Sequence, residues 1–200
     1  MKLILFMLFS FFLPFASPGA CDTIKIKVVY VIDQGWIGSE NANLVSKDLK
    51  KYLRATFPVK IKLVSGKIFL PSSGSPETQL EQAKAFSKAN GDNKIYNAIH
   101  YIFPAFNIGG LLYIGGMSYV CGVNNPERNS SVSNATVTSM STGQDRLRHS
   151  VISAAHEIGH MLGASHVKSN TLMNYQVLGL DLTNIRLSAT NANQIKACVD

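Results

Sequence analysis

The sequence contains no internal repeat and no long linker, which favours one folded domain over a tandem array. Its N-terminal apolar run, residues 3–15, is interrupted by Pro14 and is shorter than the roughly 20 apolar residues of a transmembrane helix. Cysteine is scarce, with three residues in the chain, so an intramolecular disulfide leaves one cysteine over. We therefore expect one domain without a transmembrane segment.

The first residues have the pattern of a secretory signal peptide. Lys2 is their single charge, an apolar stretch follows, and small residues precede Cys21. We expect residues 1–20 to be removed and the protein to be secreted, extracellular or periplasmic, where disulfides persist. The stretch 19–21 partly resembles a bacterial lipoprotein box, although Pro18 stands where that motif has an aliphatic residue. Lipid anchoring at Cys21 is the less favoured alternative to a free terminal thiol or to removal with the signal.

Acidic residues are also scarce: the chain has 12 of them against 19 basic residues, and its formal net charge is +7. Much of the basic excess falls between residues 25 and 67. Aromatic residues are not interleaved with these lysines and arginines, as they are in many nucleic-acid-binding surfaces. A solvated basic face is therefore the favoured interpretation, and we expect no nucleic-acid partner.

The most informative stretch is 156–166, which reads His156-Glu157-Ile158-Gly159-His160-Met161-Leu162-Gly163-Ala164-Ser165-His166. On a helix, His156 and His160 project from one face, with Glu157 beside them. Gly163 lets the helix end in a sharp turn, which brings His166 back as a third nitrogen ligand. Three neutral imidazoles with an open fourth position are typical of a catalytic zinc site.

This string is the signature of the metzincin zinc proteases, and the chain resembles that superfamily. The stretch 171–175 is similar to the metzincin methionine turn, which implies that Met173 forms a thioether floor beneath the zinc. Tyr175 matches the astacin and serralysin form of the turn, in which a tyrosine binds the zinc or stabilises the transition state. Simple packing of Tyr175 is the alternative. Whichever role Tyr175 has, we expect the substrate pocket to be lined by the residues that follow it: Gln176, Val177 and Leu178.

A second resemblance, to the reprolysin (adamalysin/ADAM) catalytic domain, rests on residues 97–103, 116–121 and 125–132. In that family these stretches form a strand, an edge strand that ends near a cysteine, and a loop. The resemblance implies that Gly116, Met117 and Ser118 bind substrate, and that Cys121 pairs with Cys198. Val167 stands where reprolysins have an aspartate, and the loop from His166 to Met173 is short, so the branch within the superfamily stays open.

Apolar spacing predicts an α/β (α+β) fold. Alternating residues predict strands at 24–30 and 59–63. We also expect a buried strand at 98–103, a glycine-interrupted edge strand at 111–120 and a short strand at 135–140. Helical spacing predicts helices at 40–56 and 77–90, one from about 143 through the histidines, and one at 188–198 with Ser188 as its N-cap. This order resembles the metzincin fold, a twisted mixed sheet of about five strands with an antiparallel edge strand, an active-site helix and a small C-terminal subdomain. We expect a catalytic domain over 21–200, with an upper subdomain over 22–165 and a lower one over 166–200.

These features predict a secreted zinc-dependent endopeptidase with one catalytic zinc ion. Zinc held by His156, His160 and His166 would activate water, and Glu157 would take its proton as general base. A non-proteolytic zinc module that binds a partner, and a zinc amidohydrolase acting on a non-peptide substrate, stay open as alternatives. We expect a monomer that acts on peptides or proteins. No cysteine-switch segment follows the signal, so either a separate protein inhibitor restrains the enzyme or it is active once exported.

Overall fold

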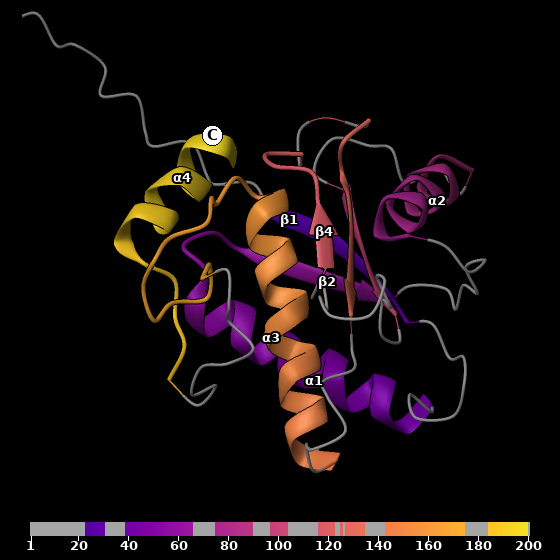
Figure 1. Ribbon diagram of the computed structural model, residues 1–200, viewed down its shortest axis with the longest axis horizontal. Coiled ribbons are helices and arrows are strands. Elements are labelled where there is room, and N and C mark those ends of the chain that lie inside the picture. The colour runs from indigo at the N-terminus through magenta and orange to yellow at the C-terminus, as the bar shows by residue number, and fades with distance from the viewer. Residues whose placement is uncertain are drawn as a thin grey trace, which may run out of the picture.

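The computed structural model describes residues 23–30, 39–65, 75–89, 97–103, 116–122, 125, 127–134, 143–174 and 184–199. The secondary-structure elements are, in chain order, β1 (Ile24–Tyr30), α1 (Ser39–Thr56), β2 (Ile61–Ser65), α2 (Pro76–Ala89), β3 (Asn97–Phe103), β4 (Gly116–Ser118), β5 (Ser130–Asn134), α3 (Gly143–Met161) and α4 (Ala189–Val199) (Figure 1). The predicted signal peptide and Cys21 lie outside the described residues. No helix in the described ranges is both long enough and apolar enough to cross a bilayer.

The strands form a five-stranded mixed sheet with the order β2-β1-β3-β5-β4. The strands β2, β1, β3 and β5 run parallel, whereas β4 pairs antiparallel with β5 at the edge. Parallel neighbours cannot be joined by a tight turn, and α1 and α2 provide the connections between β1, β2 and β3. The predicted α/β class with an antiparallel edge strand is confirmed.

The main core lies between the sheet and the helices α1 and α3, and alternation along β1 explains how that strand contributes to it. Ile24, Ile26 and Val28 are buried in this core, whereas Lys25 is exposed. The inner face of α1 follows the helical period, with Val45, Leu49 and Leu53 buried. Most basic residues of the predicted solvated face are exposed where they are described on α1, β1 and near β2: Lys25, Lys47, Lys50, Lys51, Arg54, Lys60 and Lys62. Lys27 on β1 is partly buried.

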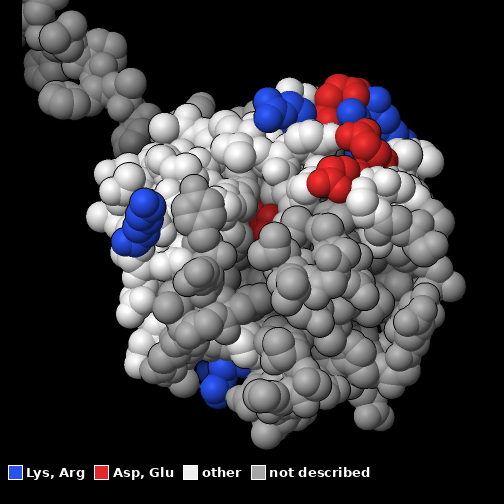
Figure 2. Space-filling model, in the orientation of Figure 1, with Lys and Arg blue, Asp and Glu red and all other residues white. Residues whose placement is uncertain are grey.

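Helix α2 packs against β5 and β4, apart from this core, and carries a cluster of opposite charges. Lys84 lies 3.8 Å from Glu81 and 3.5 Å from Glu127, and Lys88 lies 2.6 Å from Glu127. In Figure 2 red and blue groups gather together at the corner of the molecule over α2. The hydroxyl of Tyr119, just after β4, donates to Glu81 and so ties the edge strand to α2.

Most elements begin and end within a residue of the predicted bounds, and Ser188 accepts a hydrogen bond from the Asn191 backbone N–H as the predicted N-cap of α4. Strand β2 begins and ends two residues later than predicted, and β4 ends at Ser118, two residues before the predicted end of the edge strand. The prediction of a loop over 125–132 is wrong for its last three residues, because β5 begins at Ser130. The strand predicted at 135–140 lies outside the described residues, as does the 111–115 part of the predicted edge strand.

Sequence patterning missed β5 because the strand consists largely of serines. Only Val132 among its five residues is strongly apolar. Nevertheless Ser130, Ser131 and Ser133 are fully buried, since α2 and α3 both pack against this strand. Ladder hydrogen bonds to β3 and β4 and this burial stabilise β5 without an alternating hydrophobic pattern.

Candidate metal centre

Helix α3 carries His156, Glu157 and His160 through the interior of the protein. Every residue from 150 to 162 is buried, because α3 contacts both α1 and the strands β3, β4 and β5. The two histidines are one helical turn apart and therefore present their imidazoles to the same side. The helix therefore fixes the positions of two of the three predicted ligands without any contribution from a metal ion.

Gly163 lies just after α3 and turns the chain away from the helix axis. Its φ is +106°, and its N–H donates to the carbonyl of His160 at 2.8 Å. A Cβ at this position would lie 2.6 Å from the Cβ of Cys198 on α4. Only glycine suits both the backbone angle and the close approach of α4, and the turn returns the chain toward α3 at His166.

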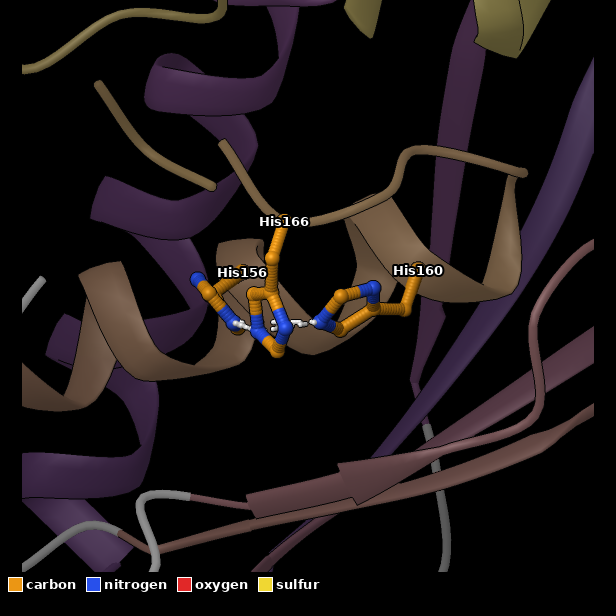
Figure 3. A group of neighbouring side chains, drawn as sticks. All are labelled: His156, His160 and His166. Carbon is orange, nitrogen blue, oxygen red and sulfur yellow. Dashed lines mark hydrogen bonds between the residues drawn. The ribbon is translucent and has the colours of Figure 1, made fainter. Parts of the chain in front are cut away.

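The three imidazoles converge on one point (Figure 3). Nε2 of His166 lies 3.1 Å from Nε2 of His156 and 3.0 Å from Nε2 of His160, and the last two are 3.2 Å apart. A tetrahedral zinc ion with bonds of about 2.0–2.1 Å needs nitrogens about 3.3 Å from one another. The observed triangle is close to that size.

The hydrogen bonds at Nδ1 indicate that the contact between Nε2 of His156 and Nε2 of His160 is not an ordinary hydrogen bond. Nδ1 of His156 donates to the carbonyl of Leu172 at 2.6 Å, and Nδ1 of His160 donates to the carbonyl of Ala164 at 2.8 Å. Each ring therefore carries its proton on Nδ1, which leaves a lone pair on Nε2. Neighbouring lone pairs would repel one another unless a cation lay among them, so the donor set fits a metal ion such as zinc.

Burial keeps the same rings neutral. Desolvation, with repulsion from the neighbouring imidazoles, lowers the pKa of His156 to about 3, and burial lowers the pKa of His160 to about 4. Burial also lowers the pKa of His166. Because a metal binds only the neutral imidazole, these shifts hold all three ligands in the form that coordinates.

Glu157 is buried between α3 and the edge strand. The residue is 5% exposed, and burial raises the pKa of its carboxyl to about 8. A Cβ at Gly116 of β4 would lie 2.5 Å from Cγ and 2.6 Å from Oε1 of Glu157. The absence of a side chain at position 116 therefore allows the backbone of the edge strand to lie against this carboxylate.

Met173 is fully buried beneath α3, in a turn that also contributes to the centre. The preceding Leu172 supplies the carbonyl that accepts from His156, and the carbonyl of Met173 accepts from the N–H of Val167 at 2.9 Å. The turn therefore supports the ligands from below and also fixes the segment that follows His166.

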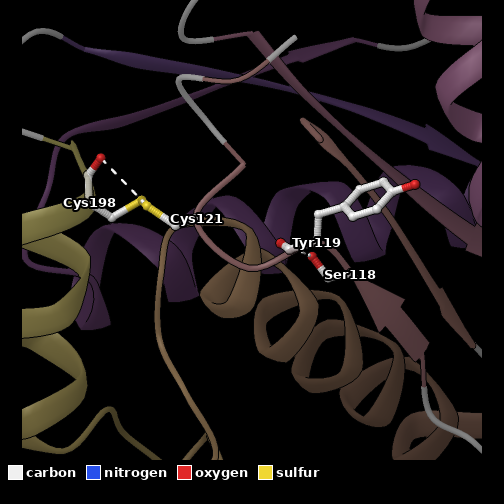
Figure 4. Close-up of a disulfide and its surroundings, with 4 residues drawn as sticks. All are labelled: Ser118, Tyr119, Cys121 and Cys198. Carbon is white, nitrogen blue, oxygen red and sulfur yellow. Dashed lines mark hydrogen bonds between the residues drawn. A yellow bond between two sulfur atoms is a disulfide. The ribbon is translucent and has the colours of Figure 1, made fainter. Parts of the chain in front are cut away.

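The disulfide joins Cys121 to Cys198, which is the pairing implied by the reprolysin resemblance (Figure 4). The N–H groups of Cys121 and Gly122 donate to the carbonyls of His160 and Met161 at 3.0 and 2.8 Å. These are carbonyls in the last turn of α3, which the helix itself leaves unpaired. The segment after β4 thus closes the end of α3 and is bonded to α4.

The structure brings the three histidines, Glu157, Met173 and the start of β4 together. Met117 and Ser118 lie on β4 and are partly exposed. Tyr175, Gln176, Val177 and Leu178 lie outside the described residues. Sequence reasoning did not identify the carbonyl acceptors Leu172 and Ala164, because a backbone carbonyl carries no sequence signal.

The fold and the three-histidine centre define a metzincin-like zinc metalloprotease. The chain belongs to metallo-peptidase family M12, whose Reprolysin_5 model matches residues 40–191. No curated protein sequence matches the chain significantly.

Solved structures share the fold at low sequence identity. The archaemetzincin AmzA of Methanopyrus kandleri is similar with a TM-score of 0.61 and 14% identity, over 88% of this chain and 96% of that chain. Metalloproteinase-II of Bacteroides fragilis is similar with a TM-score of 0.56 and 19% identity, over 89% of this chain. The match covers 53% of the Bacteroides protein, so this chain spans about half of its length.

Proposed function

We propose that this zinc-dependent peptidase is exported and cleaves peptide bonds within a chain bound along β4, with zinc at the three histidines and Glu157 as general base. One observation supports it above all: three imidazole nitrogens converge, and Glu157, next to the ligand His156 in the same helix, carries a buried carboxyl group. Structural zinc sites close the coordination shell with four protein ligands, whereas three leave a position for the reaction.

Zinc bound here would supply Lewis acidity that polarises a peptide carbonyl and acidifies water. The chain's own residues would do the rest. The carbonyls of Leu172 and Ala164 fix the ring orientation of His156 and His160, so that Nε2 of each points to the metal. A carboxylate oxygen of Glu157 would take the proton from the attacking water and deliver it to the departing amine.

The substrate would lie along β4. One edge of this strand pairs with β5, and among the described residues β4 is the last strand of the sheet. An extended peptide would add to the other edge by backbone hydrogen bonds. Because Gly116 brings β4 against Glu157, a peptide on this edge would run close to the carboxylate. Tyr175 would assist the transition state, and residues 176–178 would line the pocket.

The decisive experiment combines metal analysis with a peptidase assay. Wild type should hold near one equivalent of zinc, and His166→Ala should lose most of it. Glu157→Gln keeps the shape but removes the base, so zinc should stay while turnover falls about 10²–10⁴-fold. The matched control is Glu77→Gln on the surface of α2, which should behave as wild type.

Equal activity in Glu157→Gln and wild type would refute the role of Glu157. Zinc binding without activity toward any peptide, in wild type as well, would favour the partner-binding module, and hydrolysis of non-peptide amides alone would favour the amidohydrolase. Export is tested separately, by N-terminal sequencing of the mature protein, which should begin at or near Cys21.

A further inference from the structure

The third ligand differs from the other two because it lies outside α3. His166 follows the turn at Gly163, so its position depends on a short irregular segment rather than on helix geometry. Ala164 is fixed by the hydrogen bond from His160, and Val167 by its bond to Met173. Between them lies Ser165, which immediately precedes the ligand.

Ser165 is held by two amide side chains of α4. Oε1 of Gln194 accepts from the N–H of Ser165 at 3.1 Å, and Nδ2 of Asn191 donates to its carbonyl at 2.8 Å. Nε2 of Gln194 also donates to the Ser165 hydroxyl oxygen at 2.7 Å. Both backbone groups and the side chain of Ser165 are therefore bonded to one helix. We call these three residues the Ser165 clamp.

The clamp is anchored in the protein interior by Asn191, whereas Ser165 is exposed and Gln194 is partly exposed. Asn191 is fully buried, and its second amide hydrogen reaches Oε1 of Gln194 at 3.1 Å. Its Oδ1 accepts from the hydroxyl of Ser188 at 2.7 Å, and that hydroxyl also caps the helix. A buried amide is costly unless its donors and acceptor are bonded, and here all of them are.

The position of α4 is itself fixed relative to α3. Ile195 and Val199 are buried in the main core, and the carbonyl of Gln194 lies 3.2 Å from where a Cβ of Gly163 would be. The clamp therefore transmits the position of a rigid helix to the residue before His166. No ligand motif includes Asn191 or Gln194, which are 26 and 29 residues away from Ser165.

We propose that Asn191 and Gln194 are positioning residues for the metal: they hold Ser165 so that Nε2 of His166 stays with the other two imidazoles. This inference rests on the proposed zinc site. Residues that orient metal ligands from outside the coordination shell commonly change metal affinity by about 10–100-fold when they are replaced. We expect a change of that size for loss of the clamp.

The experiment measures the zinc dissociation constant of folded protein by competition with a chelator. Gln194 is partly exposed, so Gln194→Ala should fold and bind zinc about 10–100-fold more weakly than wild type. Asn191→Ala should do the same. Gln194→Glu should restore affinity, because carboxylate oxygens can accept from both the N–H and the hydroxyl of Ser165. Asn193→Ala, an exposed asparagine on the same helix, is the matched control and should leave affinity unchanged.

The melting temperature of the metal-free variants separates positioning from simple packing. If Gln194→Ala melts earlier but its folded form binds zinc as tightly as wild type, the clamp is merely structural and the proposal is wrong. If the affinity of Gln194→Glu is as low as that of Gln194→Ala, the proposed hydrogen bonds are wrong as well. If wild type binds no zinc, both the proposed zinc site and the clamp are wrong. If wild type and the variants bind zinc equally tightly, the zinc site stands and only the clamp is wrong.

Discussion

The sulfur of Met173 lies directly against the backbone of Gly159, so that a Cβ at position 159 would come within 2.6 Å of it. Gly159 lies between the two ligands of α3, and Met173 belongs to the turn whose Leu172 accepts from His156. Helix and turn therefore meet at a point where one partner has no side chain. This contact brings the methionine turn close enough to support the metal ligands.

The first prediction concerns that contact. Alanine normally favours a helix over glycine by up to about 1 kcal/mol. Overpacking a buried site costs about 1–3 kcal/mol. Because Met173 is fully buried, we expect this cost to exceed the gain in helix propensity, so that Gly159→Ala lowers the free energy of unfolding. Denaturant unfolding of Gly159→Ala, Met173→Ala and the double variant forms a cycle. Met173→Ala should cost less stability in the Gly159→Ala background, since it removes the clash. Additive effects would show that the two residues do not interact.

The second prediction concerns Gly116. A methyl group there would meet both the side chain of Glu157 and, at 2.5 Å, the carbonyl of Val132 on β5. Either the carboxylate or the edge strand must move, and misplacement of a catalytic group by about 1 Å can cost about 100-fold in rate. Gly116→Ala should therefore lose peptidase activity and keep its zinc. Glu77→Gln on the surface of α2 is again the control and should keep full activity. Full activity in Gly116→Ala would mean that Glu157 and β4 adapt without consequence.

The ligands could be predicted from the sequence because they lie within one helix and its following turn, where spacing alone determines geometry. His156, His160 and His166 need no tertiary contact to be recognised as a set. Strand β5 shows the opposite case. Its serines are polar, and only the packing of α2 and α3 on both sides explains their burial.

The Ser165 clamp lies beyond sequence prediction for a related reason. Asn191 and Gln194 are common helix-surface residues, and their partner is distant along the chain. Their role depends on how α4 docks, which in turn depends on the turn at Gly163 and on the core around Ile195. Spacing carries information about neighbours on one element, whereas docking is decided by the whole core.

The third prediction concerns pH and the metal-free protein. Burial raises the pKa of Glu157 from 4.5 to about 8, so between these values the unfolded chain is ionised at this residue while the folded chain keeps the proton. The unfolded state then binds fewer protons than the folded state, so the contribution of Glu157 to the free energy of unfolding falls as the pH rises through this window. Glu157→Gln cannot ionise and avoids the loss.

With chelator present, Glu157→Gln should melt at the same temperature as wild type near pH 4.5 and at a progressively higher temperature up to pH 8. Both proteins contain His156 and His160, whose lowered pKa values reduce stability as the pH falls below 6.5, so this effect cancels in the comparison. Thermal unfolding at several pH values measures the difference. Identical curves at pH 8 would mean that the buried carboxylate carries no cost, contrary to the usual conflict between catalytic charge and stability.

The fourth prediction concerns the disulfide, which joins residues 77 apart and closes a loop around α3 and the metal ligands. Chain-entropy models assign such a loop about 4 kcal/mol. Cys198→Ser should therefore lower the melting temperature, and Cys121→Ser should lower it equally, because either change removes the same bond. The double variant should add little to either single one.

Zinc affinity is the sharper measurement in these variants. The amide groups that hold Ser165 belong to Asn191 and Gln194, and α4 keeps its buried Ile195 and Val199 without the bond. The zinc dissociation constant of folded Cys198→Ser should therefore equal that of wild type, while that of Gln194→Ala rises. Weaker zinc binding in Cys198→Ser would mean that the covalent bond, and not the apolar contacts of α4, sets the position of the clamp. A melting temperature equal to that of wild type would instead mean that the core alone holds α4 in place and that the bond contributes nothing to stability.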